Sequence, residues 1–166
     1  KNINLTIPDE QCVLLCGRSG CGKTTLTRLI NGLIPQFFAG ELTGKVLLDG
    51  ENLFDLPMYR IAEKVGSVFQ NPRTQFFNVD TDSEIAFGME NEAVPQEQMG
   101  QRVVETAKAL RIENLLGRNI FALSGGEKQK IACGSAAAID PDIYVLDEPS
   151  SNLDAYAIAD FRKLLM

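Results

Sequence analysis

Residues 17–24 read Gly-Arg-Ser-Gly-Cys-Gly-Lys-Thr, which fits the pattern G-x-x-x-x-G-K-[ST] of a phosphate-binding loop. The apolar run Cys12–Cys16 before it is typical of a strand buried on both faces. Lys23–Asn31 after it carries apolar residues at helical spacing, and Gly32 is a plausible stop. This order of strand, loop and helix is the context that the pattern requires. An ordinary glycine-rich turn is therefore the weaker interpretation.

A loop of this kind turns its backbone N–H groups toward phosphate oxygens, and the helix after it presents a positive N-terminus. Lys23 supplies a point charge for the β- and γ-phosphates of ATP, which also places it in the catalytic set. The Thr24 hydroxyl is a predicted ligand of Mg²⁺. The predicted nucleotide-binding residues of this segment are Gly17, Arg18, Ser19, Gly20, Cys21, Gly22, Lys23, Thr24 and Thr25.

Two carboxylates follow the apolar run Ile143–Leu146, which reads as a buried strand. Ligands of open α/β sheets bind at the carboxyl ends of such strands. Asp147 is a predicted partner of Mg²⁺, and Glu148 a predicted catalytic residue that orients or deprotonates the attacking water. An Asp-Glu pair after a strand is common, so this segment is informative mainly together with the phosphate-binding loop.

Two further segments carry polar groups at positions of interest. Gln70 ends the predicted strand 65–69, and its amide is suited to bind Mg²⁺ or the water; a plain polar strand end is the alternative. Ser124 is suited to cap a helix whose first residues, Gly125 and Gly126, expose backbone N–H groups as a second anion site. A plain helix cap with Glu127 in the first turn is the alternative there.

Strands alternate with helices at both ends of the chain, and helices dominate its middle. Predicted strands are 12–16, 45–48, 65–69 and 143–146, and predicted helices are 23–31, 83–89, 95–110, 126–139 and 155–165. The prediction is one α/β domain over 1–166, with a P-loop NTPase core built on a parallel sheet, an inserted helical subdomain and a partial antiparallel β subdomain. The core is expected over 1–71 and 124–166, and the helical subdomain over 72–123.

Composition restricts the class of protein. A net charge of −6 and a pI near 4.7 argue against nucleic acid as the main partner. No apolar run approaches the roughly 20 residues that span a bilayer. The four cysteines form no C-x-x-C pair and there is no His, so no zinc set is expected. Cys12, Cys16 and Cys133 are expected in the core, in a reduced cytosolic protein.

The order and content of these segments resemble the ATP-binding cassette (ABC) ATPase family, from about Ile3 to the C-terminus. The resemblance implies that Phe69–Pro72 is the Q-loop, which couples nucleotide state to the helical subdomain. It implies that Ser124-Gly125-Gly126 meets the γ-phosphate held by the opposite subunit of a head-to-tail dimer. Ser151–Asp154 matches the family's D-loop, which lies along that interface and adds Asp154 to the nucleotide-binding set.

Several stretches are similar to one branch of that family, the energy-coupling factor ATPases, which drive uptake of vitamins and of cobalt or nickel ions. They are Val68–Pro72 with Gln75, Glu84–Gly88 with Glu90-Asn91, and Gln129–Ala132 with the small residues through Ser135. Arg73-Thr74 and Lys130 depart from the branch's usual residues. The resemblance implies the ATP-hydrolysing motor of an importer, peripheral on the cytoplasmic face of the membrane, with an integral membrane subunit docked on its helical subdomain.

Other classes of protein fit less well. A soluble ABC ATPase of DNA repair or translation usually carries coiled-coil or basic insertions, and a small-molecule P-loop kinase has no use for Leu123–Gly126. A regulatory cassette does not need Lys23, Asp147 and Glu148 intact. The family's switch His lies beyond the D-loop and its adenine-stacking aromatic lies upstream, whereas no aromatic precedes Phe37. We therefore expect a core trimmed at both ends that binds ATP weakly and hydrolyses little of it.

Overall fold

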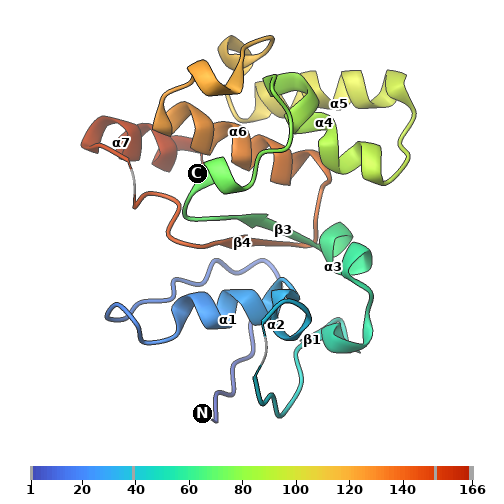
Figure 1. The fold of residues 1–166 in the computed structure, drawn as a ribbon, viewed down its shortest axis with the longest axis vertical. Coiled ribbons are helices and arrows are strands. Elements are labelled where there is room, and N and C mark those ends of the chain that lie inside the picture. The colour runs from blue at the N-terminus through green and yellow to red at the C-terminus, as the bar shows by residue number, and fades with distance from the viewer. Residues whose placement is uncertain (1, 39, 152, 165–166) are drawn as a thin grey trace.

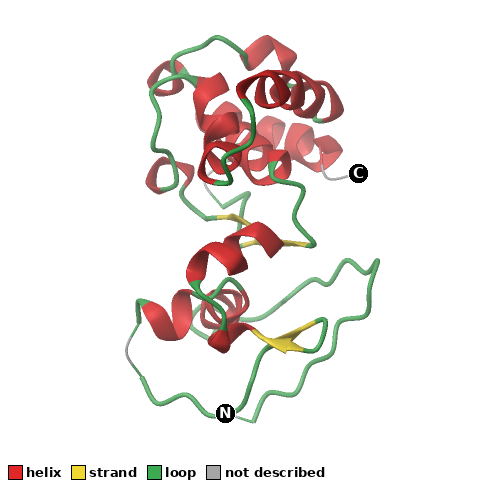
Figure 2. Ribbon diagram, turned by 90° about the vertical axis from the view of Figure 1, so that its right-hand side faces the viewer, coloured by secondary structure: helices red, strands yellow, loops and turns green. Residues whose placement is uncertain are grey.

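The computed structural model describes residues 2–38, 40–151 and 153–164. Its elements, with 3-10 turns labelled η, are α1 (Lys23–Ile30), α2 (Leu33–Gln36), β1 (Leu47–Leu48), β2 (Glu51–Asn52), η1 (Leu53–Asp55), α3 (Met58–Lys64), β3 (Val65–Val68), η2 (Pro72–Thr74), α4 (Thr81–Asn91), α5 (Gln96–Ala109), η3 (Glu113–Leu115), η4 (Ile120–Ala122), α6 (Gly125–Ala138), β4 (Ile143–Leu146) and α7 (Ala155–Leu164). Helices α4–α7 gather at one end, the β1–β2 hairpin and α1 lie at the other, and β3 and β4 run between them (Figures 1 and 2).

Strands β3 and β4 pair in parallel, with Val65 opposite Ile143 and Val68 opposite Leu146. The chain between them passes through α4, α5 and α6, so strands far apart in the sequence become neighbours (Figure 1). Because the strands are parallel, their carboxyl ends meet at one edge, where ligands of such sheets bind. The N–H of Asp147 donates to the Val68 carbonyl oxygen over 3.0 Å. This bond extends the pairing to Asp147, the first of the two predicted site carboxylates that follow β4.

The antiparallel part of the fold is the hairpin of β1 and β2, in which Leu47 lies opposite Asn52. Its two turn residues, Asp49 and Gly50, have φ values of 51° and 84°. This left-handed geometry at both positions matches the right-handed twist of the flanking strands. The predicted strand 45–48 is thus confirmed over its last two residues.

The predicted helices are confirmed to within a few residues, because capping groups end them close to the expected positions. The Asp80 carboxylate accepts the Ser83 N–H over 2.9 Å, which starts α4 ahead of the predicted Ser83. Gly32 follows α1 with φ 74°, and a Cβ there would lie 2.6 Å from Ile61. Helix α7 matches its prediction to Leu164, and Leu165 lies outside the described residues. No helix among the described residues is both long and apolar enough to span a bilayer.

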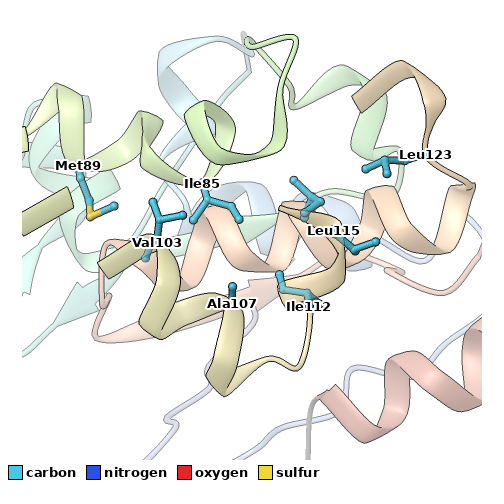
Figure 3. Packing of buried hydrophobic residues seen from close by; sticks show 9 residues of the cluster. Ile85, Met89, Val103, Ala107, Ile112, Leu115 and Leu123 are labelled. Atoms are coloured by element: carbon cyan, nitrogen blue, oxygen red, sulfur yellow. The ribbon is translucent and has the colours of Figure 1, made fainter. Parts of the chain in front are cut away.

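A buried apolar cluster joins α4, α5, η3 and α6 (Figure 3). Its members are Ile85, Met89, Val103, Ala107, Ile112, Leu115, Leu123, Ile131 and Ala138. Burying large aliphatic side chains contributes about 1.5–3 kcal/mol each, so this cluster holds α4, α5, η3 and α6 together. Since α6 shares it with α4 and α5, the division into 1–71 with 124–166 and 72–123 stays a prediction.

The strand predicted over Cys12–Cys16 is wrong. These residues form no strand in the described chain, and the side chain of Leu14 is 84% exposed. Cys12 and Cys16, expected in the core, are exposed as well. An apolar run favours a strand only where a neighbouring strand pairs with it, and the ladder of β3 and β4 does not extend to this segment.

Candidate nucleotide site

The loop over residues 17–24 has the backbone that its glycines predict. Gly20 and Gly22 have φ values of 78° and 102°, which residues with a side chain rarely adopt. The N–H of Cys21 donates to the Arg18 carbonyl oxygen over 3.2 Å and closes the turn. A Cβ at Gly17 would lie 2.5 Å from the Cys21 Sγ. α1 starts at Lys23, so the loop leads directly into the N-terminus of a helix, where the first N–H groups have no partner within the helix.

A cavity of about 270 Å³ lies over this loop. Its lining comes from three segments: Ser19, Gly20, Gly22, Lys23, Thr24 and Thr25 from the loop and α1, Gln70 from the end of β3, and Glu148 from the end of β4. The structure thus brings together residues that the sequence analysis assigned to one site from three distant segments. Gly17, Arg18 and Cys21 belong to the same loop but are not among the described residues that line the cavity.

Lys23 links the loop to the end of β4. Its Nζ lies 3.3 Å from Glu148 Oε1 and donates to the Gly17 carbonyl oxygen over 3.2 Å. Glu148 has φ 47°, a left-handed value that is uncommon for a residue other than glycine. The N–H of Ser151 donates to the Glu148 carbonyl oxygen over 3.0 Å and holds this turn. A cation and a carboxylate therefore meet in the lining of the cavity.

The donor set beside Lys23 fits Mg²⁺. The Thr24 hydroxyl donates to Asp147 Oδ1 over 3.3 Å, and the Gln70 amide lies on the same cavity. Mg²⁺ prefers oxygen ligands and usually takes only one or two from protein, with water and substrate phosphates completing its shell. A hydroxyl, a carboxylate and an amide are a set of this kind, so Thr24, Asp147 and Gln70 are the residues that would hold the ion.

The other predicted nucleotide-binding residues lie elsewhere. Of the described residues, those that line the cavity include neither Ser124, Gly125 and Gly126 nor Asp154. Ser124 begins α6, and the Asp154 carboxylate accepts the Ala157 N–H over 2.8 Å at the start of α7. Within the chain both act as helix caps. The predicted D-loop residue Asn152 lies outside the described residues.

The start of α6 is held by a capping box between Ser124 and Glu127. The Glu127 carboxylate accepts the Ser124 N–H over 2.7 Å, and the Glu127 N–H donates to the Ser124 hydroxyl over 3.2 Å. The bond from Ser124 and the Arg118 guanidinium at 2.9 Å hold the pKa of Glu127 below its usual range. Lys128 donates to the carbonyl oxygens of Leu123 and Phe121, and its burial lowers its pKa.

Sequence reasoning missed two polar contacts of the site. The Lys23–Glu148 ion pair joins residues that only the folded sheet brings together. Gln129 of α6 is 1% exposed and donates to the carbonyl oxygen of Phe69, directly before Gln70. Its position in an Ala-rich, buried helix is the signal that could have found it, because a buried amide needs a partner.

The comparisons with known proteins agree with this geometry. The family model described as "ABC transporter" matches residues 1–151. A putative ABC transporter ATP-binding protein of Treponema denticola is 58% identical over 164 residues, which are 99% of this chain and 34% of that protein. The energy-coupling factor transporter ATP-binding protein EcfA1 of Ligilactobacillus salivarius is 41% identical over 154 residues, 93% of this chain and 53% of that protein.

A solved structure is similar as well. The protein cbiO1 of Clostridium perfringens, described as part of the ABC transporter complex cbiONQ, superposes with a TM-score of 0.77 and 29% sequence identity. The match covers 90% of this chain and 58% of that one. The chain spans about a third of the length of the Treponema relative, 34%.

Proposed function

Because the chain belongs to the ABC transporter family, we propose that it binds and hydrolyses ATP to power an importer of the energy-coupling factor type. The observation that carries the proposal is the convergence of Lys23, Gln70 and Glu148 on one cavity from three segments. The similarity to EcfA1 and to cbiO1 supports the importer branch, and the cargo would be a vitamin or a metal ion.

The residues divide the work of phosphoryl transfer to water. Loop N–H groups and Lys23 bind the β- and γ-phosphates, while Thr24, Asp147 and Gln70 would hold Mg²⁺, which neutralises phosphate charge when bound. Glu148 orients a water and takes its proton as the water oxygen bonds to the γ-phosphorus. The bond from that phosphorus to the bridging oxygen breaks, and the products are ADP and phosphate. In-line attack needs Glu148 and the phosphate-binding residues on the same cavity, and Glu148, Lys23 and Thr24 all line it.

The second anion site would act on another nucleotide. Ser124, Gly125 and Gly126 lie away from the cavity of their own chain but present helix N–H groups. A head-to-tail dimer with a second ABC ATPase domain would place them against the γ-phosphate held by Lys23 of the partner, with Asp154 along the interface. The helical subdomain, 72–123, would dock an integral membrane subunit, so the protein would sit peripherally on the cytoplasmic face of the membrane.

The direct test is nucleotide binding by the full-length protein with Mg²⁺ and a fluorescent ATP analogue. Lys23→Ala should abolish binding, because the variant lacks the charge that faces the phosphates. Lys64→Ala is the matched control, because Lys64 lies in α3, outside the cavity lining, and its ion pairs with Glu51 and Asp142 among the described residues are both 3.9 Å long. Equal affinity of Lys23→Ala and the parent protein would contradict the assignment of this cavity to ATP.

A further inference from the structure

The backbone of Phe69, the residue before Gln70, is held by two glutamine side chains. Its N–H donates to Gln75 Oε1 over 3.2 Å, and its carbonyl oxygen accepts from Gln129 Nε2 over 3.4 Å. Gln75 follows η2, and Gln129 belongs to α6. The two side chains therefore hold the two peptide groups that flank the Cα of Phe69, and the second of these leads into Gln70, which lines the nucleotide cavity.

The Gln75 side-chain amide makes the two hydrogen bonds that a neighbouring strand would make to this edge of β3. While its Oε1 accepts from Phe69, its Nε2 donates to the Ser67 carbonyl oxygen over 3.1 Å. On the opposite edge β3 pairs with β4, through to the bond from Asp147 to Val68. Residues 67–69 are thus hydrogen-bonded on both sides, which leaves the position of Gln70 little freedom.

Gln129 connects the peptide group between Phe69 and Gln70 to α6. Its side chain is 1% exposed, between neighbours of α6 that are also buried, such as Lys128 and Ile131. A buried amide costs free energy unless it is hydrogen-bonded, and an apolar side chain of similar volume would fill this space without that cost. The amide therefore serves geometry rather than packing. About one helical turn before it, α6 begins at the Ser124-Gly125-Gly126 segment.

We propose that Gln129 and Gln75 are positioning residues that hold Gln70 toward the nucleotide and tie its position to α6. The proposal rests on the function proposed above. When the start of α6 meets a second nucleotide, any shift of α6 along its axis also displaces the Phe69 carbonyl group, because Gln129 is hydrogen-bonded to it. The adjacent Gln70 then moves relative to Thr24 and Glu148. This link acts on the rate of hydrolysis and leaves the phosphate-binding loop unchanged.

The test uses Gln129→Met and Gln75→Met in the full-length protein. Methionine has nearly the volume of glutamine but cannot make these hydrogen bonds. We expect kcat for ATP hydrolysis to fall about tenfold in each variant, the factor that corresponds to losing one hydrogen bond to a buried group. The Kd for ATP should change less than about threefold. Gln101→Met is the matched control, since Gln101 is exposed on α5 and bonds only Glu105 at 2.8 Å among the described contacts.

The distinguishing readout is the same pair of substitutions in a Gln70→Ala background, followed by single-turnover hydrolysis. If the two glutamines act through Gln70, they cause no further loss there. A loss of the same factor in both backgrounds, or an unchanged kcat in the single variants, would overturn the proposal. Gln75 is only half-buried, so Gln75→Met decides the matter if Gln129→Met does not fold. A parent protein that neither binds nor hydrolyses ATP would instead overturn the proposed function.

Discussion

At the scale of single residues, Lys23 makes contacts that a phosphate would replace. Its Nζ bonds the Gly17 carbonyl oxygen and lies 3.3 Å from Glu148, whose side chain is 45% exposed. Ion pairs with an exposed partner are screened by water and contribute at most about 1 kcal/mol. In the proposed function, an incoming phosphate would therefore displace Glu148 from Lys23 at small cost and free this carboxylate to act on water.

The alkylation rates of the cysteines test whether the nucleotide covers the phosphate-binding loop. Cys21 lies in the loop over which we place the phosphates, and it is exposed. Mg-ATP should therefore slow its alkylation by a small maleimide, whereas Cys12, also exposed, should react at the same rate with and without nucleotide. Cys133 should be the slowest, because burial raises the pKa of its thiol to about 12 and shields it. Peptide mass mapping measures all of these rates in one experiment.

Equal labelling of Cys21 with and without Mg-ATP would contradict the position of the phosphates. Fast labelling of Cys133 would instead contradict the packing of α6. Cys12 serves as the internal control for changes in reagent or overall stability.

The residues of the site were predictable to the extent that local rules place them. Lys23 and Thr24 follow from the loop pattern, and Asp147 and Glu148 from the rule that ligands bind at the carboxyl ends of parallel strands. The exposure of Cys16 was not predictable, because it depends on which strands pair. The roles of Gln75 and Gln129 depend on contacts between elements, which periodicity does not encode.

At the scale of elements, the start of α6 combines a helix cap with an ionisable group. Glu127→Gln should lower the unfolding midpoint at pH 7, since the bonds from Ser124 and Arg118 favour the ionised carboxylate. The cap is worth about 1 kcal/mol, or roughly 2–4 °C in a domain of this size. Thermal unfolding of the parent protein and the variant across pH 3–8 measures the difference.

The sign of the pH dependence follows from the lowered pKa. A carboxylate whose folded pKa lies below its unfolded value stabilises the fold fully above the unfolded value, about 4.3, and loses this as pH falls through the folded pKa. The gap between parent and Glu127→Gln should therefore close as the pH drops below about 4.3. Glu41→Gln, in an exposed loop, is the control. A gap that persists or widens in acid would show that Glu127 acts by packing alone.

Two helical glycines should respond in opposite ways to alanine. Gly126 faces α7, where a Cβ would lie 2.9 Å from the Ala157 Cβ, whereas a Cβ at Gly100 of α5 meets open space. Gly100→Ala should stabilise the protein by up to about 1 kcal/mol, because alanine loses less backbone entropy in a helix. Gly126→Ala should lower the unfolding midpoint, since α7 must move. A gain of similar size in both variants would contradict the close packing of α6 against α7.

Helices were easier to predict than strands in this chain. Helix bonds are local, and caps such as Asp80 and Ser124 mark the ends, so the sequence pattern determines most of the element. The strands predicted over 65–69 and 143–146 were found as β3 and β4, although Tyr144 of β4 is 52% exposed and only Val145 of that strand is buried. The apolar run 12–16 was not a strand, since a strand needs a partner that the pattern cannot supply.

At the scale of the whole molecule, a long connection builds the site. Between β3 and β4 the chain forms α4, α5 and α6 around one apolar cluster and returns to lie in parallel (Figures 1 and 3). Gln70 and Glu148 reach one cavity because of this return. The same connection carries the start of α6, so the segment proposed to meet a second nucleotide belongs to a helix that packs on β3, next to the cavity proposed for the first.

In the proposed function, this cavity binds ATP through Lys23 and hydrolyses it through Glu148. The most direct measurement is the identity and amount of nucleotide retained by the full-length protein after incubation with Mg-ATP and gel filtration. Glu148→Gln should retain intact ATP and hydrolyse it at least about 100-fold more slowly than the parent protein, because a general base contributes that much or more to such a reaction. Lys23→Ala should retain no nucleotide. Phosphate release by Glu148→Gln at the parent rate, or ATP retained by Lys23→Ala, would contradict the account.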